Sequence, residues 1–145
     1  MSEAPITYRG TVYPWHCDHM GHMNVMWYVG KFDEATWQFF AGLGMTPSFL
    51  RDSHRGMAAV EQRILYKREL HAGDTVTIRT EVLEVREKAI RFVHEMRRDE
   101  GGEVAAVTIL TGVHLDTIAR KSVPLPDAFK ARALALACAD PSRWD

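Results

Sequence analysis

The sequence contains little cysteine and no excess of charge of one sign. Cys17 and Cys138 are the only two cysteines in 145 residues, and neither belongs to a CxxC pair. A disulfide framework is therefore not expected, and reduced thiols are typical of the cytoplasm. The formal net charge is −1, with acids and bases mixed along the chain. Because a nucleic-acid binder would carry a basic stripe, we expect no nucleic-acid partner.

The distribution of apolar and charged residues also shows no targeting segment. No apolar run approaches the ~20 residues that a membrane-spanning helix needs, so we expect no membrane partner. The first residues show no basic stretch followed by an apolar one, as a secretory signal would, and a cytoplasmic location is expected. The chain is 46% hydrophobic and 26% charged, which is ordinary for a globular protein. At this length, residues 1–145 are predicted to form one domain.

The apolar pattern changes from strand-like to helical at residue 25. Residues 6–13 are rich in β-branched and aromatic side chains and predict a first strand. From Val25 the apolar residues recur at steps of three and four, which predicts a helix of about five turns. Asn24 stands at the N-cap, and Gly44 stands where a left-handed C-terminal residue is favoured. The inner stripe is expected to comprise Val25, Tyr28, Val29, Phe32, Thr36, Phe39, Phe40 and Leu43, with Lys31 on the outer side.

The remainder of the chain is dominated by strand patterns. We expect strands at residues 57–70, 75–85, 89–98 and 103–116, a connecting loop at 46–55, and a short helix at 129–139. A strand, a long helix and four further strands define an α+β domain, in which one helix lies across an antiparallel sheet. The exposed edges of such a sheet favour a homo-oligomer, either a homodimer or a homotetramer.

Reactive side chains are densest between His16 and Asn24. Four of these residues, His16, Cys17, His19 and His22, carry nitrogen or sulfur donors. Zinc sites normally take a second ligand pair from elsewhere in the chain, and no such pair is visible, so we expect neither a metal nor a cofactor. Neighbouring residues of an extended segment point to opposite sides, which disfavours Cys–His catalysis by Cys17.

Asp18 offers a third kind of chemistry. It stands in a loop before a helix N-terminus, whose free N–H groups can bind a developing oxyanion. A carboxylate there can activate water or attack an acyl carbon, and Gly21 lets the backbone bend close to a substrate. However, Asp18 also fits a simple turn, Asn24 a helix cap, and His22 a buried histidine bonded to backbone. The residue pattern alone leaves these alternatives open.

A family resemblance adds to this pattern. The run Asp18–Tyr28, DHMGHMNVMWY, resembles the D-x-x-G-H-x-N-x-x-x-Y signature of the 4-hydroxybenzoyl-CoA thioesterase-like branch of the hot-dog superfamily. The resemblance continues through Tyr66–Asp74 and covers residues 6–116. It implies a hot-dog fold, an antiparallel β-sheet wrapped around one long central helix. Residues 117–145 would then be a C-terminal extension that carries the short helix.

The resemblance also implies an activity, the hydrolysis of an acyl-CoA thioester to a free acid and CoA. In such enzymes the position of Asp18 holds the catalytic carboxylate, which acts as a general base or as a nucleophile. The backbone N–H at Val25 would polarise the thioester carbonyl, and the positions of His22 and Asn24 are also implicated. The 4-hydroxybenzoyl enzyme has Pro-Ala-Gly after the acid, whereas this chain has His-Met-Gly, which argues against an aryl substrate.

The chemistry of an acyl-CoA indicates which residues near the turn can contact the substrate. CoA carries several phosphates and needs basic residues, and the aromatic residues near the turn can contact an acyl group, including a cationic one by cation–π attraction. The segment also loosely resembles thioesterases that act on betainyl-CoA. Two alternatives are a non-catalytic acyl-CoA-binding hot-dog module and a thioesterase acting on an acyl carrier protein. The predicted substrate-binding residues are Gly21, Trp27, Tyr28, Arg63, Lys67 and Lys88.

Overall fold

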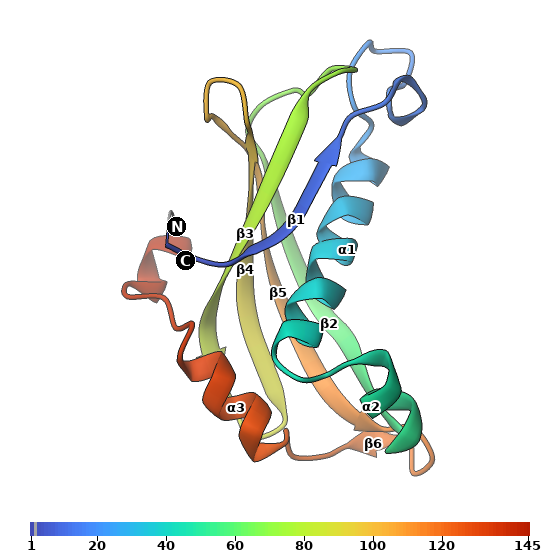
Figure 1. Ribbon diagram of the computed structural model, residues 1–145, viewed down its shortest axis with the longest axis vertical. Helices are drawn as coiled ribbons and strands as arrows, with labels where there is room; N and C mark the ends of the chain where they lie inside the picture. The colour runs from blue at the N-terminus through green and yellow to red at the C-terminus, as the bar shows by residue number, and fades with distance from the viewer. Residues whose placement is uncertain (2) are drawn as a thin grey trace. The chain divides into compact units, whose positions relative to one another are not determined.

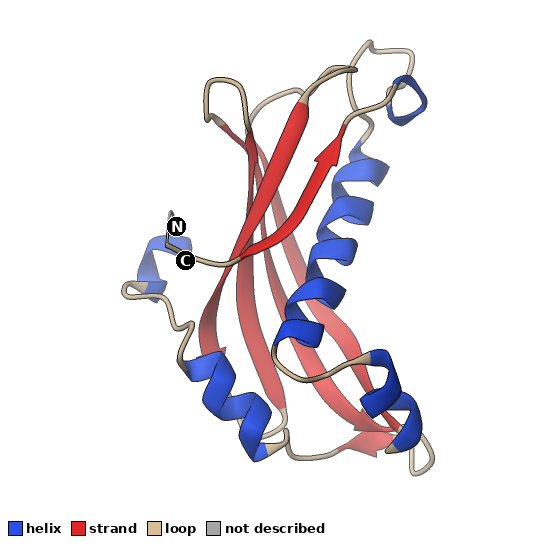
Figure 2. Ribbon diagram, viewed as in Figure 1, coloured by secondary structure: helices blue, strands red, loops and turns tan. Residues whose placement is uncertain are grey.

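The computed structural model describes residues 1 and 3–145. Figure 1 follows the elements along the chain, and Figure 2 separates helices from strands by colour. In chain order they are β1 (Ile6–Thr11), the 3₁₀ helix η1 (Pro14–His16), α1 (Val25–Gly42), α2 (Pro47–Asp52), β2 (Arg55–Tyr66), β3 (Thr75–Val85), β4 (Ala89–Arg98), β5 (Val104–Asp116), β6 (Lys121–Ser122), α3 (Asp127–Leu134) and the 3₁₀ helix η2 (Pro141–Trp144).

The strands pair in the order β1-β3-β4-β5-β2, with β6 beside β5. β1 runs antiparallel to β3, with Tyr8 opposite Ile78, and β6 runs antiparallel to β5. The predicted α+β class, an antiparallel sheet with one long helix, is therefore confirmed. The strand order places the C-terminal end of β1 beside β3, and the chain continues from this end into the His16–Asn24 turn.

Several predicted element bounds were wrong. β2 covers residues 55–66 rather than 57–70, and α3 covers 127–134 rather than 129–139. The predicted loop at 46–55 contains α2, because Thr46 Oγ1 accepts a hydrogen bond from the Phe49 N–H at 3.2 Å and Pro47 stands in the first turn. Capping residues, rather than apolar periodicity, give the signal for such a short helix.

Contacts group the chain into two compact units, the first of which comprises Met1–Gln38, Ile64–Thr80 and His94–Thr108. In this unit one side of α1 packs on one face of the strands (Figure 1). The alternate residues Val76, Ile78 and Thr80 of β3 are all buried here, so one face of this strand faces the core. The buried core consists of Val12, Met23, Tyr28, Phe32, Ala35, Leu70, Val76, Ile78, Met96, Ala105 and Ala106.

The inner side of α1 differs from the predicted stripe. Val25 and Val29 are exposed, whereas Lys31, expected on the outer side, is only 3% exposed. The Lys31 ammonium donates to the Tyr8 hydroxyl at 3.0 Å and lies 3.3 Å from the Thr11 carbonyl oxygen. These partners on β1 satisfy a charge that would otherwise be too costly to bury.

His94 on β4 is completely buried in the same unit. Its ring nitrogens lie 2.8 Å from Thr36 Oγ1 and 2.6 Å from Thr80 Oγ1, and its ring stacks on Phe32. Burial lowers the pKa of His94 to about 3, so the imidazole is neutral at physiological pH. It therefore links α1, β3 and β4 through hydrogen bonds rather than through charge.

The second unit comprises Phe39–Arg63, Glu81–Val93 and Ile109–Asp145. Gly44 has a φ of +100°, as predicted for a left-handed residue after α1, and Arg132 of α3 donates to the Leu43 carbonyl at 3.1 Å. The core of this unit consists of Phe39, Phe40, Leu43, Met45, Val82, Ile90, Phe92, Leu110, Leu125, Phe129 and Ala133.

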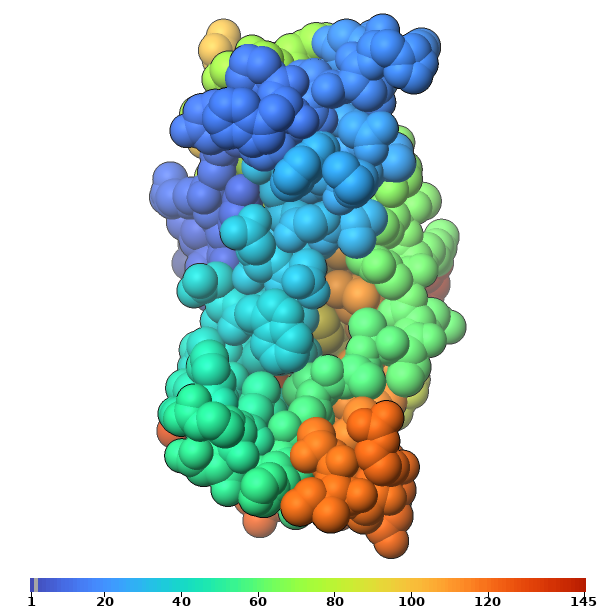
Figure 3. All heavy atoms as spheres, turned by 90° about the vertical axis from the view of Figure 1, so that its right-hand side faces the viewer, coloured from blue at the N-terminus to red at the C-terminus, as the bar shows by residue number. Residues whose placement is uncertain are grey.

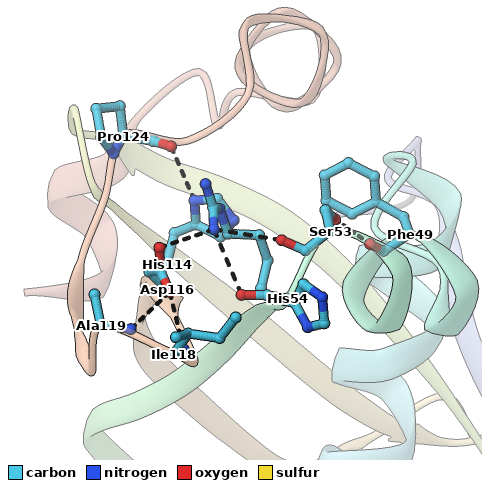
Figure 4. Close-up of polar contacts among 9 residues, drawn as sticks. Phe49, Ser53, His54, His114, Asp116, Ile118, Ala119 and Pro124 are labelled. Atoms are coloured by element: carbon cyan, nitrogen blue, oxygen red, sulfur yellow. Dashed lines mark hydrogen bonds and ion pairs between the residues drawn. The ribbon is translucent and has the colours of Figure 1, made fainter.

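A polar cluster ties the start of β2 to the end of β5 (Figure 4). Arg55 pairs with Asp116 at 3.1 Å and also reaches the carbonyl oxygen of His54. His114 Nδ1 donates to the Pro124 carbonyl at 2.9 Å. Backbone N–H groups lower the pKa of Asp116, with a smaller effect of the Arg55 charge. The cluster holds the ends of two paired strands in register.

β2 forms one edge of the sheet and is largely exposed. Figure 3 shows this green segment at the molecular surface, and residues 59–63 are exposed on both strand faces. Within the described residues, no helix is both long enough and apolar enough to span a membrane.

Candidate active site

The turn between η1 and α1 is closed by its own backbone. Asp18 N–H donates to the His22 carbonyl at 3.2 Å, Gly21 N–H donates to the Asp18 carbonyl at 3.0 Å, and Cys17 pairs with Met23 in an isolated antiparallel bridge. Gly21 has a φ of +87°, which a side-chain-bearing residue rarely adopts. The glycine therefore lets the chain reverse direction, and its predicted contact with a substrate stays a prediction.

The Asp18 carboxylate is held from two sides. Its Oδ1 accepts from the Met20 N–H at 2.8 Å, and its Oδ2 accepts from Asn24 Nδ2 at 2.7 Å. The Asn24 bond, followed by the Met20 bond, lowers the pKa of Asp18 below its usual range. The half-buried carboxylate is thus ionised at neutral pH and fixed in direction.

Asn24 performs two structural tasks with one amide. Its Oδ1 accepts from the Met26 N–H at 2.9 Å, so it caps α1, while its Nδ2 holds Asp18. The predicted cap is confirmed, the bond to Asp18 is an addition to it, and a direct catalytic role of Asn24 stays a prediction. The start of the helix and the orientation of the carboxylate are therefore coupled.

The first turn of α1 leaves one donor free for a ligand. The Met26 N–H is bonded to Asn24 Oδ1, and the Trp27 N–H donates to the Asn24 carbonyl at 3.0 Å. A residue at the first helical position has no intrahelical acceptor, which leaves the Val25 N–H without a partner in the described part of the chain. This N–H and the positive end of the helix dipole suit a developing negative charge.

A pocket of about 220 Å³ opens beside the helix start. Its apolar floor includes Tyr28, which is 4% exposed and donates from its hydroxyl to the Arg68 carbonyl at 2.9 Å. Burial, with a smaller effect of the Glu69 charge, raises the pKa of Tyr28 to about 12, so the phenol stays neutral. The pocket is lined by His22, Met23, Val25, Tyr28, Tyr66, Lys67, Arg68 and Glu69.

His22 faces this pocket rather than lying in the core. Its Nε2 is 3.5 Å from the Glu69 carboxylate, and its ring meets that of His71 edge-on at 6.5 Å. The alternative of a buried histidine bonded only to backbone is therefore wrong. Glu69 positions an imidazole at the edge of the pocket.

Four aromatic rings, here called the ring cluster, lie next to the turn: Tyr13, Trp15, His16 and Trp27. Tyr13 and Trp15 stack at 4.6 Å between centroids and 6° between planes. The His16 ring stands at 65° to Tyr13 and 70° to Trp15, and it packs on Trp27 at 4.4 Å. Burial, followed by the Lys31 charge, lowers the pKa of His16, which favours a neutral imidazole.

The structure gathers most of the predicted site residues in the first unit. Asp18, Gly21 and Asn24 form the turn; His22, Val25, Tyr28 and Lys67 line the pocket; and Trp27 belongs to the ring cluster. The remaining two, Arg63 on β2 and Lys88 in the turn before β4, are exposed residues of the second unit and do not line this pocket.

Four of the pocket residues were not among the predicted site residues: Met23, Tyr66, Arg68 and Glu69. Tyr66 meets the Tyr28 ring edge-on at 5.3 Å. Tyr66 was part of the stretch that carried the family resemblance, and this was the available signal for it. Among residues 1 and 3–145, no three His, Cys, Asp or Glu side chains are grouped to hold a metal ion.

Comparisons with known proteins identify the family of this chain. Residues 12–133 match the model of the thioesterase-like superfamily. The chain is 26% identical over 137 residues to betainyl-CoA thioesterase of Pseudomonas aeruginosa, covering 94% of this chain and 86% of that protein. It is 28% identical over 112 residues, 77% of this chain, to L-carnitine dehydrogenase/betainyl-CoA thioesterase of Agrobacterium fabrum, but spans only 23% of that protein's length.

The fold is shared with solved structures. A hypothetical protein from Staphylococcus aureus, solved in complex with CoA, superposes with a TM-score of 0.87 at 18% identity, covering 94% of this chain and 89% of that one. The sheet, the long helix and this likeness define the hot-dog fold. The chain belongs to the thioesterase-like superfamily, and the family expected from the Asp18–Tyr28 signature is confirmed.

Proposed function

We propose that this protein hydrolyses an acyl-CoA thioester, with Asp18 as the catalytic carboxylate and the start of α1 as the oxyanion hole. The observation that carries this proposal is the pairing of an oriented, ionised carboxylate with an unfilled helix-start N–H. Asn24 and the Met20 N–H hold Asp18, and Val25, the first residue of α1, lines the pocket. The family and the thioesterase activity named for both curated relatives support the reaction type.

In the proposed reaction, the thioester carbonyl oxygen accepts a hydrogen bond from the Val25 N–H. Asp18 takes a proton from water, the resulting hydroxide adds to the carbonyl carbon, and negative charge collects on the oxygen near the helix dipole. The tetrahedral intermediate then expels the CoA thiolate, which receives the proton from Asp18. In the second route Asp18 attacks the carbonyl carbon itself and expels the CoA thiolate, which forms a mixed anhydride. Water then hydrolyses the anhydride to the free acid and Asp18, and the thiolate takes up the proton that is released.

Neighbouring residues have supporting roles in this proposal. Asn24 orients Asp18, Gly21 keeps the turn open, and His22, positioned by Glu69, borders the pocket at the helix start. Lys67 at the pocket supplies positive charge toward CoA, which carries phosphate groups.

Betainyl-CoA is the first substrate to test, because both curated relatives are named as betainyl-CoA thioesterases. The chain would act as one domain over residues 1–145, because α1 and four strands (β2, β3, β4 and β5) run through both units. The exposed β2 edge supports pairing with a second copy into a homodimer or homotetramer in the cytoplasm.

The proposal is tested by a thiol-release screen over betainyl, short, branched, aryl and long acyl-CoAs, with Asp18→Asn as the control. Turnover of at least one thioester that falls about a hundredfold or more in Asp18→Asn supports the assignment. Calorimetric binding of CoA without any turnover would instead favour the non-catalytic binding module. Turnover confined to thioesters on an acyl carrier protein would favour that carrier as the substrate.

A further inference from the structure

We propose that the ring cluster of Tyr13, Trp15, His16 and Trp27 binds a quaternary ammonium group on the acyl part of the substrate. This inference rests on the proposed hydrolysis of an acyl-CoA and deepens it by assigning the residues that select the acyl group. Trp15 and Trp27 would supply the indole faces, and Tyr13 and His16 would hold them in place.

The exposure of these rings is the first argument. Trp15 is 67% exposed and Tyr13 is 46% exposed, although the two rings stack on each other. Leaving such large apolar surfaces in water forgoes the stabilisation that burial gives. Exposed aromatic groups beside a reactive turn are typical of ligand-binding surfaces.

The angles between the rings are the second argument. The His16 ring meets the Tyr13 and Trp15 rings edge-on, at 65° and 70° between planes, and so holds the stacked pair at a fixed angle. Quaternary ammonium ions bind over the faces of aromatic rings, and indole gives the strongest cation–π attraction. The arrangement is preorganised, because the Tyr13 N–H donates to His16 Nδ1 at 3.0 Å and Pro14 fixes the start of η1.

The local charges are compatible with a cation. The lowered pKa of His16 leaves its imidazole neutral, so it does not repel a positive group. The carboxylate of Asp18 is ionised and follows Trp15 by three residues. Lys31 is the nearby cation that acts on His16, but its ammonium is bonded to the Tyr8 hydroxyl and offset by the Glu34 charge.

Proximity to Asp18 distinguishes an ammonium group from the adenine of CoA, which also stacks on aromatic rings. Three residues span at most about 11 Å between Cα atoms, and Trp27 lies one helical turn beyond Asn24. The ring cluster is therefore close to the carboxylate that acts on the thioester. In an acyl-CoA the pantetheine and pyrophosphate arm separates the adenine from the thioester, whereas an acyl ammonium group lies beside it.

The decisive test compares two acyl-CoAs of the same shape. Betainyl-CoA carries a trimethylammonium group, and 3,3-dimethylbutanoyl-CoA replaces its nitrogen by carbon and has no charge. We expect the wild-type protein to hydrolyse betainyl-CoA with the higher kcat/KM. Trp15→Leu and Trp27→Leu should each reduce the ratio of the two kcat/KM values about 5- to 30-fold. Trp15→Phe should retain most of the preference because it keeps an aromatic face.

Trp37→Leu is the matched control, because Trp37 is an exposed tryptophan of α1 outside the ring cluster. It should leave the ratio unchanged, and circular dichroism of each variant checks folding. A wild-type protein that shows no preference for the charged substrate overturns the inference. A preference that survives both Trp15→Leu and Trp27→Leu also overturns it, even if hydrolysis itself depends on Asp18.

A binding measurement separates this inference from the proposed function. Tetramethylammonium chloride should quench the intrinsic tryptophan fluorescence saturably in the wild-type protein, and sodium chloride at the same concentration should not. Trp15→Leu should weaken that binding. Saturable binding without hydrolysis of any acyl-CoA would support the subsite and refute the proposed reaction. Hydrolysis without such binding and without preference for betainyl-CoA would support the proposed reaction and refute the subsite.

Discussion

Replacing Asn24 separates its two tasks, because serine can cap a helix but cannot donate from an amide to Asp18. Asn24→Ala removes both the cap on the Met26 N–H and the Asp18 bond. Loss of an N-cap costs about 1 kcal/mol. In a domain of this size that corresponds to a fall in Tm of about 2–5 °C. Asn24→Ser should keep most of that stability.

Catalysis should respond differently from stability. Both variants lose the hydrogen bond that makes the largest contribution to the lowered pKa of Asp18. The pKa of Asp18 should therefore rise toward its usual range, and the acid limb of the pH–rate profile should move to higher pH in both. A carboxylate that is no longer oriented should lower kcat by about 10- to 100-fold.

The assays are a thermal melt for Tm and thiol release against pH for kcat. Near wild-type kcat in Asn24→Ser would refute the inference that the Asn24 amide orients Asp18. An equal loss of Tm in Asn24→Ser and Asn24→Ala would refute the capping argument. Because each outcome bears on one hydrogen bond, the two roles are tested independently.

Three further predictions concern Asp18, Gly21 and His94. Asp18→Asn should lower kcat at least about a hundredfold, with an unchanged far-ultraviolet circular dichroism spectrum. Gly21→Ala should destabilise the fold by about 1–2 kcal/mol in urea titration because φ is +87° at this position, even though no atom lies within 4 Å of an added Cβ. Gly21→Asn should destabilise the fold less, and an equal loss of stability in the two variants would contradict this reasoning. His94 has a folded pKa lowered to about 3, so the unfolded chain binds its proton first as pH falls below 6.5. Stability should therefore fall by up to about 1.4 kcal/mol per pH unit in the window from 6.5 toward 3, and His94→Gln should flatten the slope of urea stability against pH.

The turn itself was the most predictable part of the site. Asn24 and Gly44 were assigned from local helix-capping rules, and both assignments agree with the geometry. The Asp18–Tyr28 signature led to the family and the fold. These features depend on residues close together in sequence, where spacing restricts the possible geometry.

Features that depend on distant partners were not predicted. Lys31 was expected on the outer side of α1, but it is buried because Tyr8 and Thr11 accept its hydrogen bonds from another element. Glu69 reaches His22 across 47 positions of sequence, so no spacing rule identified the pair. A single sequence shows which residues are polar, but it does not show which distant group will satisfy each one.

The exposed edge strand β2 also has a consequence for aggregation. Val60 is 62% exposed and Leu65 is 40% exposed on a strand with an unpaired edge, which is the kind of segment that can seed fibrils. Between them lie Glu61, Gln62 and Arg63, whose polar side chains interrupt the apolar run. Such residues oppose the stacking of identical strands, because like charges would then lie in register. We therefore expect the Glu61–Arg63 segment to disfavour the in-register stacking of many identical strands, an arrangement distinct from the pairing of two copies.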